Sequence, residues 1–98
     1  MPANPKPGHP SAFWRWKFNK RDVWEYLLNN PMDQFFSTDI PILTVHKVGH
    51  AMKELHWDRF FTRGRLHGGY GAYVYNVTEN FLYYRNEYQD SLKAQNGD

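Results

Sequence analysis

The sequence predicts a mainly α-helical protein with an extended proline-rich N-terminal arm, one short helix, and two longer amphipathic helices joined by a glycine-rich turn. Prolines gather in the first ten residues, and an apolar stripe recurs at helical spacing between residues 42 and 55. A second seam repeats at alternating steps of four and three residues between 70 and 88. The expected organisation is an arm over residues 1–20, a helical region over 21–92 and a polar tail over 93–98.

The N-terminal arm is expected to be extended because prolines stand at positions 2, 5, 7 and 10, where they exclude a helix. The next segment alternates the aromatic rings of Trp14, Trp16 and Phe18 with the cations Arg15 and Lys17. In an extended chain this alternation places the rings on one face and the cations on the other. The pattern therefore predicts an aromatic and basic clip at the end of the arm.

The short helix is predicted to begin at Asp22, because Glu25 follows three residues later in the pattern of a capping box. It should end before Pro31, which cannot continue a helix. The second helix is expected to start at Thr38 or Asp39, with Pro41 in its first turn, and to continue to about residue 59 or 61.

The third helix is predicted from about residue 69 to residue 90, after a turn that contains the glycines of residues 64–71. Its seam consists of Tyr70, Val74, Val77, Phe81, Tyr84 and Tyr88. Polar side chains such as Asn76 and Glu79 interrupt this segment. A charged residue near the middle of a span costs about 2.5–3.5 kcal/mol, so autonomous insertion into a membrane is not expected.

Composition excludes several classes of function. The chain has no cysteine, which rules out disulfides, thiolate catalysis and cysteine-ligated zinc. The glycine cluster lacks the Lys-Ser/Thr pair of a phosphate-binding loop. No catalytic signature is present, so we expect no enzymatic activity and no cofactor.

Two histidines stand one helical turn apart at His46 and His50. This spacing suits a metal ion, but Lys47 occupies the position at which zinc proteases carry their catalytic glutamate. The sequence therefore favours a solvent-facing pair over a metal site.

Aromatic residues make up 18% of the chain, which suggests surfaces that contact a partner. The expected partner-interface anchors are Trp14, Trp16, Trp24, Trp57, Phe60, Phe61, Tyr73, Phe81 and Tyr84. Lipid head groups are a further expected partner, through Arg15, Lys17, Lys20 and Arg21. Nucleic acid is not the favoured partner, because acids nearly balance the bases and the net charge is only +2.

Residues 60–84 carry a resemblance to a known family. Phe60-Phe61-Thr62-Arg63-Gly64, followed by Gly68, Ala72, Val74, Val77 and Tyr83-Tyr84, resembles the C-terminal stretch of a small accessory subunit in the membrane arm of mitochondrial complex I. The resemblance implies a non-catalytic structural subunit, peripheral to the mitochondrial inner membrane or embedded among other subunits. ATP synthase or another respiratory complex fits the same features. An RNA-contacting accessory protein of a mitochondrial ribosome is the alternative. In it, basic side chains that include Arg59, Arg63 and Arg65 would contact phosphates.

Overall fold

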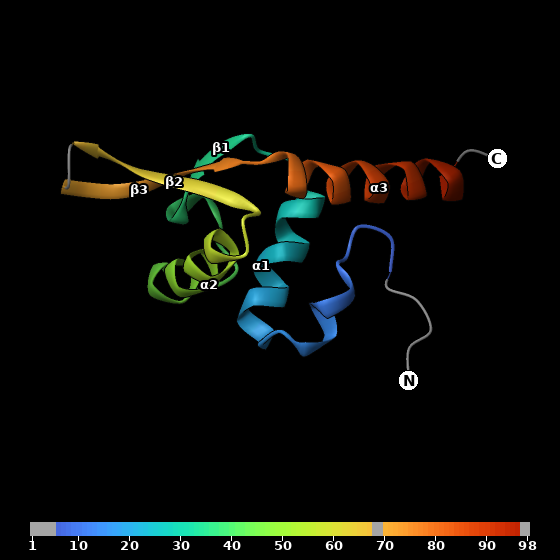
Figure 1. The fold of residues 1–98 in the computed structure, drawn as a ribbon, viewed down its shortest axis with the longest axis horizontal. Coiled ribbons are helices and arrows are strands. Elements are labelled where there is room, and N and C mark those ends of the chain that lie inside the picture. The colour runs from blue at the N-terminus through green and yellow to red at the C-terminus, as the bar shows by residue number, and fades with distance from the viewer. Residues whose placement is uncertain (1–5, 68–69, 97–98) are drawn as a thin grey trace.

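The computed structural model describes residues 6–67 and 70–96, without the side chains of 66–71 and 96. The first prolines of the expected arm and the end of the expected polar tail lie outside the described residues. The elements follow one another as η1 (Ser11–Arg15), α1 (Phe18–Asn29), β1 (Gln34–Phe36), η2 (Ser37–Asp39), α2 (Val45–Trp57), β2 (Phe61–His67), β3 (Tyr70–Val77) and α3 (Glu79–Asn96), where η marks a short 3-10 helix (Figure 1).

The described strands form an antiparallel sheet in the order β1-β3-β2. Helix α2 lies beside this sheet, and α1 crosses between α2 and the start of α3 (Figure 1). The hairpin of β2 and β3 and the helix α3 point to opposite ends of a molecule that measures 48 × 29 × 23 Å (Figure 1).

The prediction of a mainly α-helical fold is wrong, because residues 61–67 and 70–77 pair as the antiparallel strands β2 and β3. The predicted seam is split: Val74 and Val77 belong to β3, whereas Phe81 and Tyr84 belong to α3. Valine and tyrosine favour strands, and a spacing of four and three residues resembles helical periodicity without requiring a helix. Strand pairing favours the strand over a helix here, because β3 lies between β1 and β2 and its Tyr75 is buried.

The segment before α1 is not an extended clip. Residues 11–15 form the 3-10 helix η1, and α1 begins at Phe18, four residues before the predicted start. Trp16 therefore packs inward, with its ring centroid 5.3 Å from that of Trp24, while Trp14 and Phe18 remain exposed. Lys17 precedes α1 without a capping side chain. Helix α1 ends at Asn29, before Pro31, where the sequence predicted its end.

Helix α2 is shorter than predicted at both ends. It begins after Thr44, whose side-chain oxygen accepts a hydrogen bond from the backbone N–H of Lys47 at 3.3 Å. It ends because Arg59 adopts a φ of 68° and its N–H donates to the carbonyl of His56, while Phe60 N–H donates to the carbonyl of Leu55. These two hydrogen bonds close the last turn of α2. Arg59 adopts the left-handed conformation that glycine usually occupies at this position after a helix. The sequence gives no signal at this position.

One core holds the elements together around Trp24, a residue with no exposed surface. Its ring meets those of Phe60 and Phe81 edge to face, each at a centroid distance of 4.9 Å. Edge-to-face pairs add about 0.5–1.5 kcal/mol each to the free energy gained from area burial. The buried apolar residues are Phe13, Val23, Trp24, Leu27, Leu28, Phe35, Ile40, Val48, Ala51, Met52, Leu55, Phe61, Tyr75 and Phe81.

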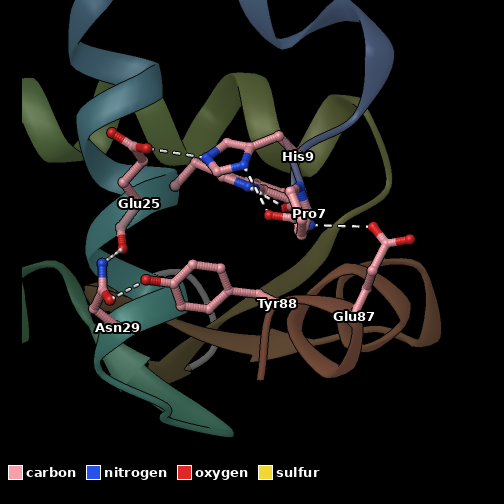
Figure 2. Close-up of polar contacts among 8 residues, drawn as sticks. Pro7, His9, Glu25, Asn29, Glu87 and Tyr88 are labelled. Carbon is pink, nitrogen blue, oxygen red and sulfur yellow. Dashed lines mark hydrogen bonds and ion pairs between the residues drawn. The ribbon is translucent and has the colours of Figure 1, made fainter. Parts of the chain in front are cut away.

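The segment of residues 6–10 is tied to α1 and α3 by polar contacts (Figure 2). The Gly8 N–H donates to the Glu87 carboxylate at 3.1 Å, and the Gly8 carbonyl accepts the indole N–H of Trp24 at 2.9 Å. The ring of His9, which is 4% exposed, lies 3.0 Å from the carboxylate of Glu25. Gly8 has a φ of 85° and faces Tyr88 so closely that a Cβ atom at Gly8 would stand 2.6 Å from that of Tyr88.

Candidate functional site

The exposed side of α2 forms a ridge between two hollows. The hairpin-side hollow, of about 580 Å³, lies between α2, η2 and the β2–β3 hairpin. The α1-side hollow, of about 400 Å³, lies between α2 and the start of α1. His50 lines both hollows, so the ridge of α2 separates them and is continuous with each.

The hairpin-side hollow is positively charged. Its lining includes Lys53, Arg63, His46 and His50, and it contains no aspartate or glutamate among the described residues. The remainder of the lining is apolar, aromatic or hydroxyl-bearing, and consists of Phe36, Ser37, Thr38, Val45, Gly49, Ala72, Tyr73 and Tyr75. A concave surface with cations and no acid concentrates anionic ligands.

Several carboxylates have cationic partners of their own, and one of these, Glu54, lines the α1-side hollow. In the described part of the chain, Glu54 and Asp58 hold Lys20, Asp33 holds Arg85, and Glu25 contacts His9. Lys47, Lys53 and Arg63 form no ion pair with any described acid. The modest net charge of +2 therefore conceals a surface on α2 and the hairpin where positive charge is not internally compensated.

Aromatic rings position the cations of the hairpin-side hollow. The guanidinium carbons of Arg63 and Arg65 each lie 4.3 Å from the ring centroid of Tyr73, and the Arg65 guanidinium donates to the Tyr73 hydroxyl at 2.9 Å. Lys53 Nζ lies 5.1 Å from the ring centroid of Trp57. The hydrogen bond from Arg65 lowers the pKa of the Tyr73 phenol below its ordinary value, and the charges of Arg63, Arg65 and Lys53 act in the same direction. The lowered pKa therefore follows chiefly from the Arg65 hydrogen bond, with a smaller contribution from the neighbouring positive charges.

His46 and His50 stand on the ridge itself. Their Nε2 atoms are 3.1 Å apart, and both side chains are exposed. A neutral pair forms one N–H···N hydrogen bond. Among the described residues there is no cluster of three or more histidine, cysteine, aspartate or glutamate side chains that could hold a metal ion. The neutral pair therefore presents one free Nδ1–H donor and one free Nδ1 acceptor on the ridge.

Gly49 occupies the floor of the hairpin-side hollow, in the interior of α2. A Cβ atom at this position would meet no atom within 4 Å. Glycine in a helix interior costs about 0.5–1 kcal/mol relative to alanine, and no packing contact among the described residues requires it here. Its absence of a side chain lets a ligand approach the backbone of α2 closely.

The predicted partner-interface anchors are distributed between core and surface. Trp24, Phe61 and Phe81 are at most 1% exposed, so the chain's own core covers them. The half-buried Trp16, Phe60 and Tyr84 pack against that core. Trp14, at 37% exposed, and Trp57, at 64%, retain free surface, and Tyr73 lines the hairpin-side hollow.

The cations expected to contact lipid head groups differ in their exposure to solvent. Lys20 is 7% exposed, and its ammonium lies 2.6 Å from Asp58, so it acts within the fold. Arg15 and Lys17 are exposed, and Arg21 is half-buried. Sequence reasoning missed Lys53, Gly49 and Tyr73 as members of one surface. The helical spacing of 46, 49, 50, 53 and 57 was the available signal for α2, but the neighbouring hairpin was not foreseen.

No protein-family model matches this chain, and neither a curated protein nor a solved structure shows detectable similarity to it. No helix among the described residues is long and apolar enough to cross a membrane.

Proposed function

We propose that this protein binds duplex DNA, with α2 in the major groove and the cations of the two hollows on the phosphate backbones. The observation that carries the proposal is the uncompensated positive charge along α2 and the hairpin, where Lys47, Lys53 and Arg63 have no acidic partner among the described residues. Phosphate contacts of this kind supply most of the affinity in nucleic-acid binding.

The shape of the site supports a helix placed in a groove. The major groove of B-form DNA is about 12 Å wide and admits one α-helix, whose exposed side chains then meet the base edges. On α2 the exposed side chains of His46, Lys47 and His50 occupy that position. The hollows on either side of the ridge place cations where the flanking backbones would run.

The topology gives the same indication by analogy. An exposed helix followed directly by a β-hairpin, with the order β1-β3-β2 in the sheet, is the arrangement of winged helix-turn-helix domains. Here the helix that usually precedes the reading helix is reduced to the 3-10 turn η2. Such a likeness bears on the fold, and the function is argued from the charges and hollows of the site.

The proposal differs from the sequence-based alternative of an RNA-contacting protein. The major groove of A-form RNA is deep and narrow, and side chains on a helix cannot read it. We therefore expect stronger binding to a DNA duplex than to an RNA duplex of the same sequence.

Fluorescence anisotropy with a labelled mixed-sequence DNA duplex tests the proposal. The dissociation constant is measured over a series of salt concentrations for the wild-type chain and for Lys53→Gln and Arg63→Gln. Each variant should bind more weakly and should reduce the slope of log K against log salt by about 1, because one phosphate contact is lost.

The matched control is Lys93→Gln, which removes the same charge from the last turn of α3, away from both hollows. This variant should bind DNA like the wild type. Failure of the wild-type chain to bind DNA would overturn the proposal, and an equal loss in all three variants would mean that only net charge matters. Equal affinity for the RNA duplex would contradict the placement of α2 in the major groove.

Membership of a mitochondrial inner-membrane complex, most readily complex I, stays a prediction, as does the absence of enzymatic activity. The complex-membership hypothesis required aromatic anchors covered by partner subunits. It now has fewer anchors available, since Trp24, Phe61 and Phe81 are buried within the chain. Trp14 and Trp57 are predicted anchors with exposed rings that still favour it.

A further inference from the structure

An aromatic patch at the start of α1 is not explained by the binding of paired DNA alone. We define the α1 patch as Trp14, Phe18 and Arg21. Phe18 is 77% exposed and Trp14 is 37% exposed. The chain itself leaves most of the Phe18 ring unburied, so this ring is available to a ligand.

Cations lie beside the rings of the α1 patch. The Arg21 guanidinium carbon lies 5.1 Å from the ring centroid of Trp14 and 5.5 Å from that of Phe18. Lys6 Nζ lies 5.5 Å from Trp14, and the side chain of Lys17 is exposed beside Phe18. Rings interleaved with cations are the combination that binds single-stranded nucleic acid, since bases stack on the rings and phosphates meet the charges.

The α1 patch is continuous with the proposed DNA-binding surface. Phe18 and Lys17 line the α1-side hollow together with Lys47 and His50 of α2. A strand that leaves a duplex bound on α2 therefore reaches Phe18 without crossing any other element of the described chain.

From this continuity we infer that the preferred ligand is a DNA duplex with a single-stranded extension, and that Phe18 stacks on an unpaired base. The inference rests on the proposed function and specifies its ligand. A base within a duplex is stacked on both faces and offers no free face to a side chain, whereas an unpaired base does. The arrangement thus assigns paired DNA to α2 and the hairpin, and the unpaired strand to the α1 patch.

The test compares two labelled probes by anisotropy: a blunt DNA duplex, and the same duplex with a single-stranded extension. The wild-type chain should bind the extended probe more tightly. Phe18→Leu keeps an apolar side chain but has no aromatic face, so it should lose about fivefold or more of the affinity for the extended probe. It should lose a clearly smaller factor for the blunt one, because Phe18 also lines the α1-side hollow. Phe18→Trp keeps the stacking face and should retain the preference.

The outcomes separate this inference from the proposed function. Binding of both probes with equal affinity by the wild-type chain overturns the inference and leaves the duplex-binding function standing. Binding of neither probe overturns both. An equal loss of affinity for both probes in Phe18→Leu also contradicts the stacking role. If the wild-type chain shows no preference for the extension and instead binds vesicles that contain anionic phospholipid, the α1 patch belongs to a lipid surface and the inference is wrong.

Discussion

Replacing Gly8 by alanine tests how the N-terminal segment is attached to the fold. Gly8 joins the N-terminal segment to two helices, because its carbonyl accepts the Trp24 indole N–H of α1 and its N–H donates to Glu87 of α3. The new Cβ atom would stand 2.6 Å from the Cβ atom of Tyr88 and 3.2 Å from the carbonyl oxygen of Tyr84. Neither neighbour can move easily, since one is the root of a side chain and the other is helix backbone.

The expected loss of unfolding free energy is about 1–3 kcal/mol, because the less costly of two routes limits it. A residue with a Cβ atom at a φ of 85° costs about 1–2 kcal/mol in left-handed backbone strain. Overpacking against Tyr88 adds about 1–3 kcal/mol unless the segment detaches. Detachment instead removes the partner of the Trp24 indole N–H, which costs about 1–3 kcal/mol. Either route consumes a large share of the 5–15 kcal/mol by which a typical domain is stable.

Urea unfolding followed by tryptophan fluorescence measures this loss. Gly49→Ala is the matched control, because its Cβ atom meets nothing within 4 Å in the interior of α2. It should raise the unfolding free energy by about 0.5–1 kcal/mol. A double-mutant cycle of Gly8→Ala with Trp24→Phe should show a coupling of about 0.5 kcal/mol or more, since Trp24→Phe removes the hydrogen bond that Gly8→Ala displaces or breaks.

The proposed attachment is refuted if Gly8→Ala changes stability by less than about 0.5 kcal/mol, the usual range for a surface substitution. Additivity in the double-mutant cycle would show that the Trp24 N–H does not depend on Gly8. If Gly49→Ala lowers the unfolding free energy as much as Gly8→Ala does, the contacts of the new Cβ atom with Tyr88 and Tyr84 are not the cause of the loss.

Two further predictions concern charged groups. Lys20→Met keeps the alkyl stem and leaves Glu54 and Asp58 in contact with water, so we expect the unfolding free energy in urea to fall by about 1–2 kcal/mol. The double variant Glu54→Ala, Asp58→Ala leaves the ammonium of Lys20, whose side chain is 8% exposed, without an acidic partner, and should lower it by more, about 3 kcal/mol. The reverse order of these two losses would contradict a buried lysine that is stabilised by its acids. The Tyr73 phenol, whose pKa is lowered chiefly by the Arg65 hydrogen bond, should ionise below the ordinary tyrosine value of about 10, as measured by the ultraviolet absorbance difference between wild type and Tyr73→Phe. Arg65→Gln should raise this pKa. Because the folded state favours the phenolate, the unfolding free energy of the wild type should rise relative to that of Tyr73→Phe as the pH rises through the lowered pKa towards 10. If Arg65→Gln leaves the pKa of the Tyr73 phenol unchanged, the Arg65 hydrogen bond is not the cause of its lowering.

Local patterns located α1 and α2 but not their boundaries. Pro31 stops α1 because proline blocks helix propagation, and Val48, Met52 and Leu55 face the core as their spacing predicted. The start of α1 at Phe18 and the end of α2 before Arg59 depend on tertiary contacts. Arg59 tolerates a left-handed backbone because its carbonyl accepts hydrogen bonds from Thr78 and Asn80, residues far along the chain.

The candidate site shows the same division. Helical spacing alone places His46, His50 and Lys53 on one side of α2. The contribution of Arg63 and Tyr73 depends on the hairpin, which the seam of apolar residues did not reveal.

The sequence by itself determined the absence of thiol chemistry, the apolar stripe of α2 and the aromatic character of the core, because these follow from residue type and short-range spacing. Tertiary structure decided which rings are buried and which cations lack an acidic partner. Strand pairing joins residues as distant as Gln34 and Asn76, and burial of Lys20 depends on Asp58 of another element. Such pairings are selected by the free energy of the whole fold, and a local sequence pattern contains no record of them.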